Sequence, residues 1–92
     1  MSMTGKDRAT LRSQAHHLDV KVHVGHAGIT PSVVGSLDDV LRTQELVKCQ
    51  VVKASDLSAK EAAQQLAQQL DAEVIQVIGR TFTLYREKSE ES

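Results

Sequence analysis

The sequence predicts a two-layer α/β (α+β) fold with elements in the order α-β-α-β-α-β-β. Two observations predict it. Three segments space their apolar residues three and four positions apart, as amphipathic helices do, and four shorter segments carry strand-like apolar patterns. A helix between two strands favours a right-handed crossover and parallel strands, whereas a two-residue turn makes its strands antiparallel. We therefore expect one mixed four-stranded sheet, with the second and third helices on one face and the other face partly open.

Size, charge and cysteine usage favour one small domain. The chain has 92 residues, a net charge of −1 and a single cysteine. We expect one domain over residues 1–86 and a polar, acidic tail over residues 87–92. A lone cysteine fits a reducing compartment, and the sequence shows neither a signal peptide nor an apolar run long enough for a membrane span. A cytoplasmic protein is therefore expected, and its bulk charge gives no signal for nucleic acid.

Residues 7–17 are predicted to form the first helix. Leu11, Ala15 and Leu18 give it an apolar stripe at helical spacing. The first strand follows, where valines alternate with polar residues, so that the valines should face the core and the residues between them solvent. The valines are Val20, Val22 and Val24, and the residues between them are Lys21 and His23.

The second helix has clear start signals. Thr30 is placed as its N-cap, and Pro31 occupies the first helical position, where a missing N–H costs nothing. Its core face is predicted to consist of Val33, Leu37, Val40 and Leu41. Residues 46–53 are predicted to form the second strand, in which Val47, Cys49 and Val51 alternate with Lys48 and Gln50. Within that strand, Cys49 is interpreted as a buried packing residue rather than a reactive thiol.

The third helix and the last two strands complete the chain. Ser58 and Glu61 have the spacing of a capping box, so the third helix should begin there. Its apolar stripe is Ala62, Ala63, Leu66, Ala67 and Leu70. Residues 74–78 and 81–86 are predicted as strands joined by a Gly79-Arg80 hairpin turn. Phe82 and Leu84 should pack against the second and third helices, with Thr81, Thr83 and Tyr85 on the other face.

The segment Gly25-His26-Ala27-Gly28 is the most informative feature for function. It lies between the first predicted strand and the start of the second helix. Two glycines three apart let a backbone approach a phosphodiester closely, and a helix N-terminus adds N–H groups and partial positive charge. A GxxG loop of this kind contacts single-stranded nucleic acid in KH domains. Glycines in such turns also serve shape alone, so the loop by itself leaves both interpretations open.

Other chemistry finds little support in the sequence. The histidines that invite a metal are His16, His17, His23 and His26, but no carboxylate or cysteine completes a known ligand spacing, and no metal or cofactor is expected. No nucleophile elbow or phosphate-binding GK[ST] loop occurs, so we do not expect an enzyme. The scattered basic residues are either a solubilising surface or part of a nucleic-acid surface: Arg8, Arg12, Lys21, Lys48, Arg80 and Arg86.

Four segments together resemble a known family, the CRM domain in its stand-alone bacterial, YhbY-like form. They are LRSQAHHL at 11–18, VHVGHAGIT at 22–30, ELVKC at 45–49 and VIGRTFTLYR at 77–86. The resemblance covers almost the whole chain, and the motifs stand in the right order. It implies a compact fold similar to the C-terminal domain of translation initiation factor three.

The resemblance also implies RNA binding through the loop Gly25, His26, Ala27 and Gly28, with Lys48 and Arg80 as neighbouring basic residues. Arg8, Arg12, Lys21 and Arg86 complete the predicted RNA-binding set. Bacterial members of the family associate with precursors of the large ribosomal subunit, so a monomeric, non-enzymatic RNA-binding protein of ribosome assembly is expected. The alternative is a protein-interaction module that uses the open sheet face without RNA.

Overall fold

The computed structural model describes the backbone of residues 5–86 and the side chains of residues 9–86. The predicted tail, residues 87–92, lies outside the described residues. The element order is the predicted one: α1 (Gly5–Ala15), β1 (Val20–Val24), α2 (Pro31–Thr43), β2 (Leu46–Val51), α3 (Ala59–Leu70), β3 (Glu73–Ile78) and β4 (Thr81–Tyr85).

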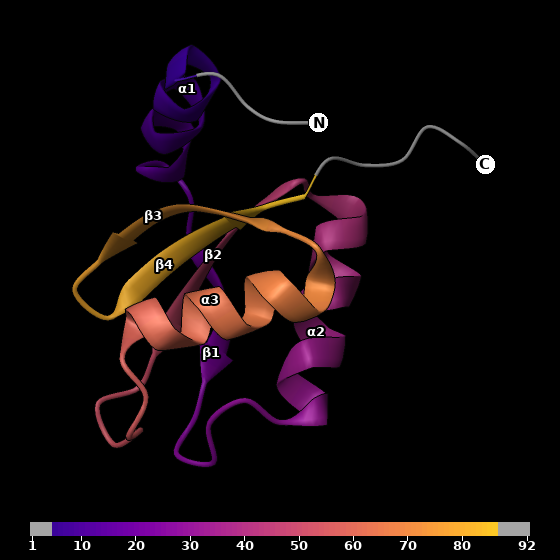
Figure 1. Cartoon of the computed structure of the whole chain (residues 1–92), viewed down its shortest axis with the longest axis vertical. Helices are drawn as coiled ribbons and strands as arrows, with labels where there is room; N and C mark the ends of the chain where they lie inside the picture. The colour runs from indigo at the N-terminus through magenta and orange to yellow at the C-terminus, as the bar shows by residue number, and fades with distance from the viewer. Residues whose placement is uncertain (1–4, 87–92) are drawn as a thin grey trace.

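The strands form one mixed four-stranded sheet in the order β1-β2-β4-β3, which confirms the predicted fold class (Figure 1). Strands β1 and β2 pair in parallel, and β4 pairs antiparallel with both β2 and β3. Strand β3 therefore runs in the same direction as β2, but β4 lies between them. This central place explains why β4 is buried on both faces, with Phe82, Thr83 and Leu84 in succession.

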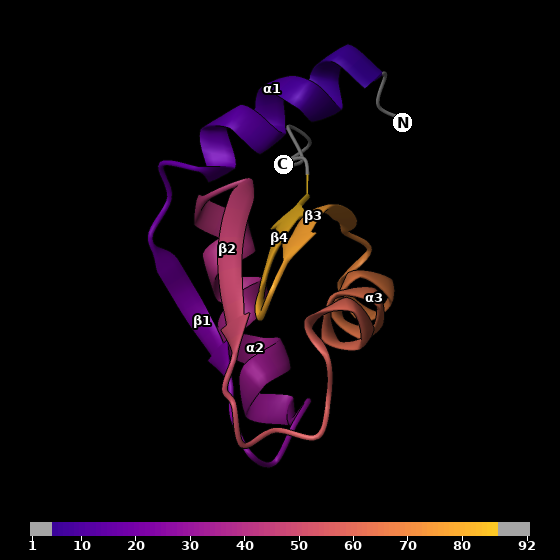
Figure 2. The same cartoon turned by 90° about the vertical axis from the view of Figure 1, so that its left-hand side faces the viewer.

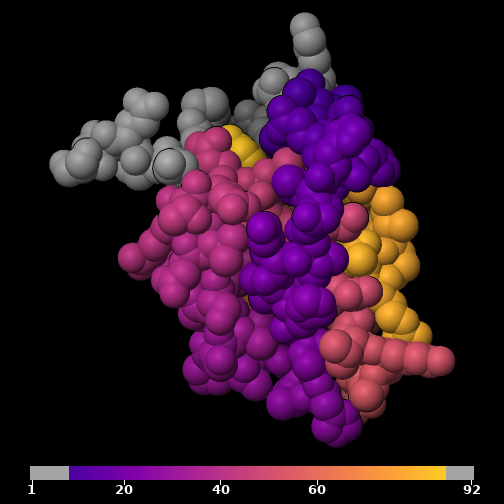
Figure 3. Space-filling model, turned by 180° about the vertical axis from the view of Figure 1, so that it is seen from behind, coloured from indigo at the N-terminus to yellow at the C-terminus, as the bar shows by residue number. Residues whose placement is uncertain are grey.

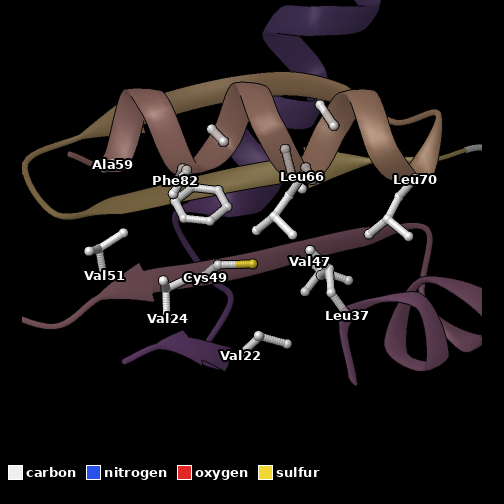
Figure 4. Packing of buried hydrophobic residues seen from close by; sticks show 14 of the residues in the cluster. Val22, Val24, Leu37, Val47, Cys49, Val51, Ala59, Leu66, Leu70 and Phe82 are labelled. Carbon is white, nitrogen blue, oxygen red and sulfur yellow. The ribbon is translucent and has the colours of Figure 1, made fainter. Parts of the chain in front are cut away.

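Helices α2 and α3 cover one face of the sheet and enclose the core. Helix α2 contacts β1 and β2, and α3 contacts β2, β3 and β4. Figure 4 shows the Phe82 ring between α3 and β2, beside Leu66 and Cys49. The predicted packing of Phe82 and Leu84 into the core is confirmed, as is the burial of Cys49.

Helix α1 lies apart from the other two helices, at one end of the sheet (Figure 2). It contacts β2 and β3. Three buried residues, Ala15, Ile75 and Thr83, lie outside the main core cluster. We infer that α1 covers this part of the second sheet face and leaves the rest open, because Lys21 and His23 are exposed as predicted.

The helix starts follow the sequence signals. Thr30 Oγ1 accepts a hydrogen bond from the Val33 N–H at 3.2 Å, and Pro31 begins α2. At α3, the Glu61 N–H donates to Ser58 Oγ at 3.1 Å while the Ser58 N–H donates to Glu61 Oε1 at 3.1 Å. Both caps pair backbone N–H groups that a helix start leaves without partners.

Several element boundaries differ from the predicted ones. Helix α1 ends at Ala15 rather than residue 17, because the His16 and His17 N–H groups donate to carbonyls three residues back and the helix closes in a turn. Strand β2 ends at Val51 rather than residue 53. Its neighbour β1 ends at Val24, whose carbonyl accepts from the Val52 N–H, and β4 begins only at Thr81, so no strand remains for Lys53 to pair with. The last strands run over 73–78 and 81–85.

The prediction that Val20 faces the core together with Val22 and Val24 was wrong. Val22 and Val24 are buried in the core cluster, but Val20 is half-buried and does not belong to it. The pairing of β1 with β2 shifts register between Val20 and Val22, so that Val20 pairs with Lys48. Such an irregularity breaks the strict alternation of faces on which the prediction rested.

Candidate nucleic-acid interface

The Gly25–Gly28 loop connects the end of β1 to the start of α2. The Gly28 N–H donates to the Gly25 carbonyl at 3.0 Å, which closes a tight turn. Gly28 has φ +79°, whereas Gly25 does not have a positive φ and a side chain there would meet open space. The loop thus places a short stretch of exposed backbone, centred on His26 and Ala27, directly before the positive end of the α2 dipole.

A second loop, between β2 and α3, lies against the first. Nδ1 of His26 is 3.1 Å from the Ala54 carbonyl oxygen, and the Val52 N–H donates to the Val24 carbonyl at 3.0 Å. Both loops leave the carboxyl ends of neighbouring parallel strands, and Figures 1 and 2 show them at the same end of the molecule. We call this end of the molecule the loop end.

An open pocket of about 240 Å³ lies between the two loops. Its lining consists of His26, Ala27, Gly28, Ile29, Ser55, Asp56, Leu57 and Gln65. The lining contains neither lysine nor arginine, and Asp56 contributes a carboxylate. A phosphate would therefore be favoured at the exposed loop backbone rather than deep in this pocket.

Two basic residues lie at the loop end. The Arg80 carbonyl in the β3–β4 turn accepts from the Val51 N–H at 2.8 Å, which fixes that turn beside the end of β2. Lys53 precedes Ala54, the partner of His26, and the side chains of Arg80 and Lys53 are both exposed. Arg80 belongs to the predicted set. Lys53 was missed, although its place at the end of the second predicted strand was a usable signal, because parallel strands end at one edge.

Four of the other predicted basic residues lie on β1, β2 and α1. Lys48 is half-buried in β2 and is paired in register with Thr83, and Lys21 is exposed at the register shift in β1. Arg12 is exposed on α1, and Arg8 lies on α1 with its side chain outside the described residues. Figure 3 shows α1 at one end of the molecule and the segment leading into α2 at the other, with β1 between them.

Arg86 lies at the opposite end of β4 from the loop end. Its Nη1 donates to Asp38 Oδ1 at 2.9 Å and to the Leu70 carbonyl at 3.2 Å, and its Nη2 donates to the Asp38 carbonyl at 3.3 Å. The hydrogen bond from Arg86 is the main cause that lowers the pKa of the Asp38 carboxyl, against a smaller desolvation effect in the other direction. The structure thus ties the Arg86 guanidinium to α2 and α3 and does not bring it to the loop. Its contact with RNA stays a prediction.

Two further features concern the described part of the chain. None of its helices is long and apolar enough to pass through a bilayer. Within the same residues, no three histidine, cysteine, aspartate or glutamate side chains come together as metal ligands would.

Comparison with known families gives a match over nearly the whole chain. The profile of the CRS1/YhbY (CRM) domain matches residues 3–86. This span holds the Gly25–Gly28 loop, all four strands and the three described helices.

Two relatives carry RNA binding in their names, and the second is longer than this chain. The chain is 32% identical over 88 residues to the probable RNA-binding protein YqeI of Bacillus subtilis, covering 96% of this chain and 92% of that protein. It is 41% identical over 86 residues to the probable RNA-binding protein MJ0652 of Methanocaldococcus jannaschii, covering 91% of this chain and 63% of that protein.

A solved structure shares the fold. The solution structure of SAV1595 from Staphylococcus aureus, a candidate RNA-binding protein, superposes with a TM-score of 0.82 at 35% sequence identity. The match covers 99% of this chain and 95% of that one.

Proposed function

Because the chain belongs to the CRS1/YhbY (CRM) domain family, we propose that it is a non-enzymatic RNA-binding protein whose Gly25–Gly28 loop contacts the RNA backbone. The names of YqeI and MJ0652 as RNA-binding proteins support this proposal. The observation that carries it is the position of the loop: a tight glycine turn directly before α2, with basic residues on two neighbouring connections.

The loop suits a phosphodiester for three physical reasons. Its exposed backbone between Gly25 and Gly28 has few side-chain atoms to keep a phosphate away. The N-terminus of α2 adds partial positive charge. Arg80 and Lys53 add full charges on the two connections that follow in the sheet order, at the ends of β2 and β4, where they would neutralise neighbouring phosphates.

RNA bound at the loop end would extend over the open side of the sheet toward Lys21, Lys48 and α1. Base stacking would contribute little there, because Phe82 is buried in the core and Tyr85 is half-buried. Recognition would then depend on the shape and charge of the backbone. Because base stacking contributes little and the net charge is −1, affinity for RNA would depend on a few local contacts.

We further propose that the RNA belongs to precursors of the large ribosomal subunit, and that the protein acts as a cytoplasmic monomer in ribosome assembly. This part rests on the family resemblance of the motifs at 11–18, 22–30, 45–49 and 77–86.

The proposal is tested by measuring affinity for fragments of large-subunit ribosomal RNA precursor at several salt concentrations. With about three phosphates neutralised, the logarithm of the association constant should fall with the logarithm of salt at a slope of about −2. Ala27→Asp places a negative charge at the exposed loop and should weaken binding about tenfold or more. Gln69→Glu, the same change in charge on the exposed side of α3, should leave affinity nearly unchanged.

Three outcomes would overturn the proposal: no binding, binding without salt dependence, or equal affinity of the parent and a folded Ala27→Asp variant. The second outcome would favour the protein-interaction alternative. Two exposed apolar side chains beside the β3–β4 turn support that alternative: Ile78 is 54% exposed and Val77 is 39% exposed. An Ile78→Ser variant separates the two, because it should weaken an apolar protein contact and leave affinity for RNA unchanged.

A further inference from the structure

His26 stands at the centre of the exposed loop and is the only titratable residue of Gly25–Gly28. Its side chain is exposed, and one ring nitrogen, Nδ1, is 3.1 Å from the Ala54 carbonyl oxygen. The other ring nitrogen, Nε2, has no hydrogen-bond partner within residues 9–86, whose side chains the structure describes. The ring is thus anchored on one side and free on the other.

The anchored side decides the tautomer. A carbonyl oxygen only accepts hydrogen bonds, so Nδ1 must carry the proton that it donates to Ala54. In the neutral ring Nε2 then bears a lone pair, which cannot donate to a phosphate oxygen. When the ring takes up a second proton, Nε2 becomes a donor and the ring gains a positive charge.

We propose that His26 is a proton-coupled phosphate contact: the loop binds an RNA phosphate through the protonated ring, and RNA binding therefore takes up a proton at this residue. This inference rests on the proposed function and extends it to the chemistry and pH dependence of the same loop. An imidazolium bonded to a phosphate is a charge-assisted hydrogen bond, stronger than a bond between neutral groups.

Groups of both signs lie around His26. From the β2–α3 loop, Asp56 lines the pocket together with His26, and Lys53 precedes Ala54 in the chain. Gln65 of α3, which also lines the pocket, is uncharged, and the N-terminus of α2 carries partial positive charge. A bound phosphate would add a negative charge close to the ring, which favours its charged form.

The test measures affinity for the same precursor RNA fragment from about pH 5.5 to about pH 8.5 at constant ionic strength, across the range where histidine changes charge. The parent protein should bind about tenfold more weakly at the upper end, the usual size of one charged hydrogen bond. His26→Asn keeps a short amide donor for Ala54 and removes Nε2. It should bind at every pH as the parent does at high pH. His17→Gln, in the exposed turn that precedes β1 and so far from the loop, should keep the parent's pH dependence.

Calorimetry in buffers of different ionisation enthalpy gives an independent measurement. The parent should take up a fraction of one proton on binding near neutral pH, and His26→Asn should take up much less. Binding by the parent that does not vary with pH, or an unchanged pH dependence in a folded His26→Asn variant, would overturn the inference and leave the proposed function standing. Absence of RNA binding at every pH would overturn both.

Discussion

The two glycines of the Gly25–Gly28 loop differ in what their backbone requires. Gly28 has φ +79°, a conformation that L residues adopt at a cost, while Gly25 does not have a positive φ. A Cβ at Gly28 would lie 3.5 Å from Leu57 Cδ1, an ordinary contact, so the cost there comes from the backbone and not from a clash.

We predict that Gly28→Ala lowers the free energy of unfolding by about 1–2 kcal/mol. Gly25→Ala should change it by less than about 0.5 kcal/mol, because nothing lies within 4 Å of a Cβ there. Urea denaturation of the two variants and the parent measures the difference. Equal losses for both variants would show that the positive φ does not set the cost. For this reason Ala27→Asp, rather than a change at Gly28, is the clean probe of RNA binding.

Cys49 is buried in β2. Burial raises the pKa of its thiol to about 12, because the thiolate would lie away from water. A thiol reagent at pH 8 should therefore label the folded protein very slowly and the urea-unfolded protein at once. Since the pKa is raised on folding, the free energy of unfolding should also fall as pH rises from about 9 toward 12. Rapid labelling of the folded protein would contradict this account of the core.

At the scale of the elements, Phe82 of β4 tests the packing of α3 on the sheet. Its side chain is 1% exposed and belongs to the core cluster. Phe82→Ala should lower the free energy of unfolding by about 3–5 kcal/mol, because it leaves a cavity that the neighbours fill only in part. A loss below about 1 kcal/mol in denaturant melts would mean that the ring is peripheral.

Arg86 joins three elements at the end away from the loop. It holds the end of β4 to Asp38 of α2 and to the last carbonyl of α3, Leu70. Arg86→Ala should lower Tm at neutral pH and leave affinity for RNA unchanged, which would remove Arg86 from the predicted contact set. Arg42→Ala is the matched control, because Arg42 also pairs with Asp38 at 3.1 Å but its side chain is 71% exposed.

The Arg86–Asp38 ion pair predicts that stability depends on pH. The pKa of Asp38 is lowered on folding, so its contribution to stability is present above its ordinary value of 3.8 and is lost as pH falls through the lowered value. The difference in Tm between the parent and Arg86→Ala should therefore shrink below about pH 4. If Arg86→Ala lowers Tm no more than Arg42→Ala does at every pH, the result would contradict a structural role for Arg86.

For the whole molecule, the sequence was a good guide where the determinants are local. The cap at Thr30, the capping box of Ser58 and Glu61, and the turn at Gly79 each depend on residues within a few positions. The strand-like apolar patterns located all four strands, and the alternation of faces predicted the burial of Val47, Phe82 and Leu84 but failed for Val20. These features follow from periodicity and turn chemistry alone.

What the sequence left open depends on residues far apart in the chain. A two-residue turn fixes the pairing of β3 with β4, but it does not decide which of the two strands pairs with β2. The burial of Thr83 on the second sheet face likewise becomes clear only in the assembled sheet. The loop was found as a motif, yet the contact of His26 with Ala54 joins residues 28 positions apart. Arg86 gains its place through the same kind of long-range contact, with Asp38 and Leu70.

The central claim is that RNA binds at the loop end, and amide chemical-shift mapping by NMR of this 92-residue protein tests it most directly. On titration with a fragment of large-subunit ribosomal RNA precursor, the largest shifts should fall in residues 25–30, 53–57 and 79–81, with smaller shifts along β1 toward Lys21. Amides around Asp38, Leu70 and Arg86 should not move. Shifts concentrated on the outer faces of α2 and α3, with residues 25–30 unchanged, would contradict the account.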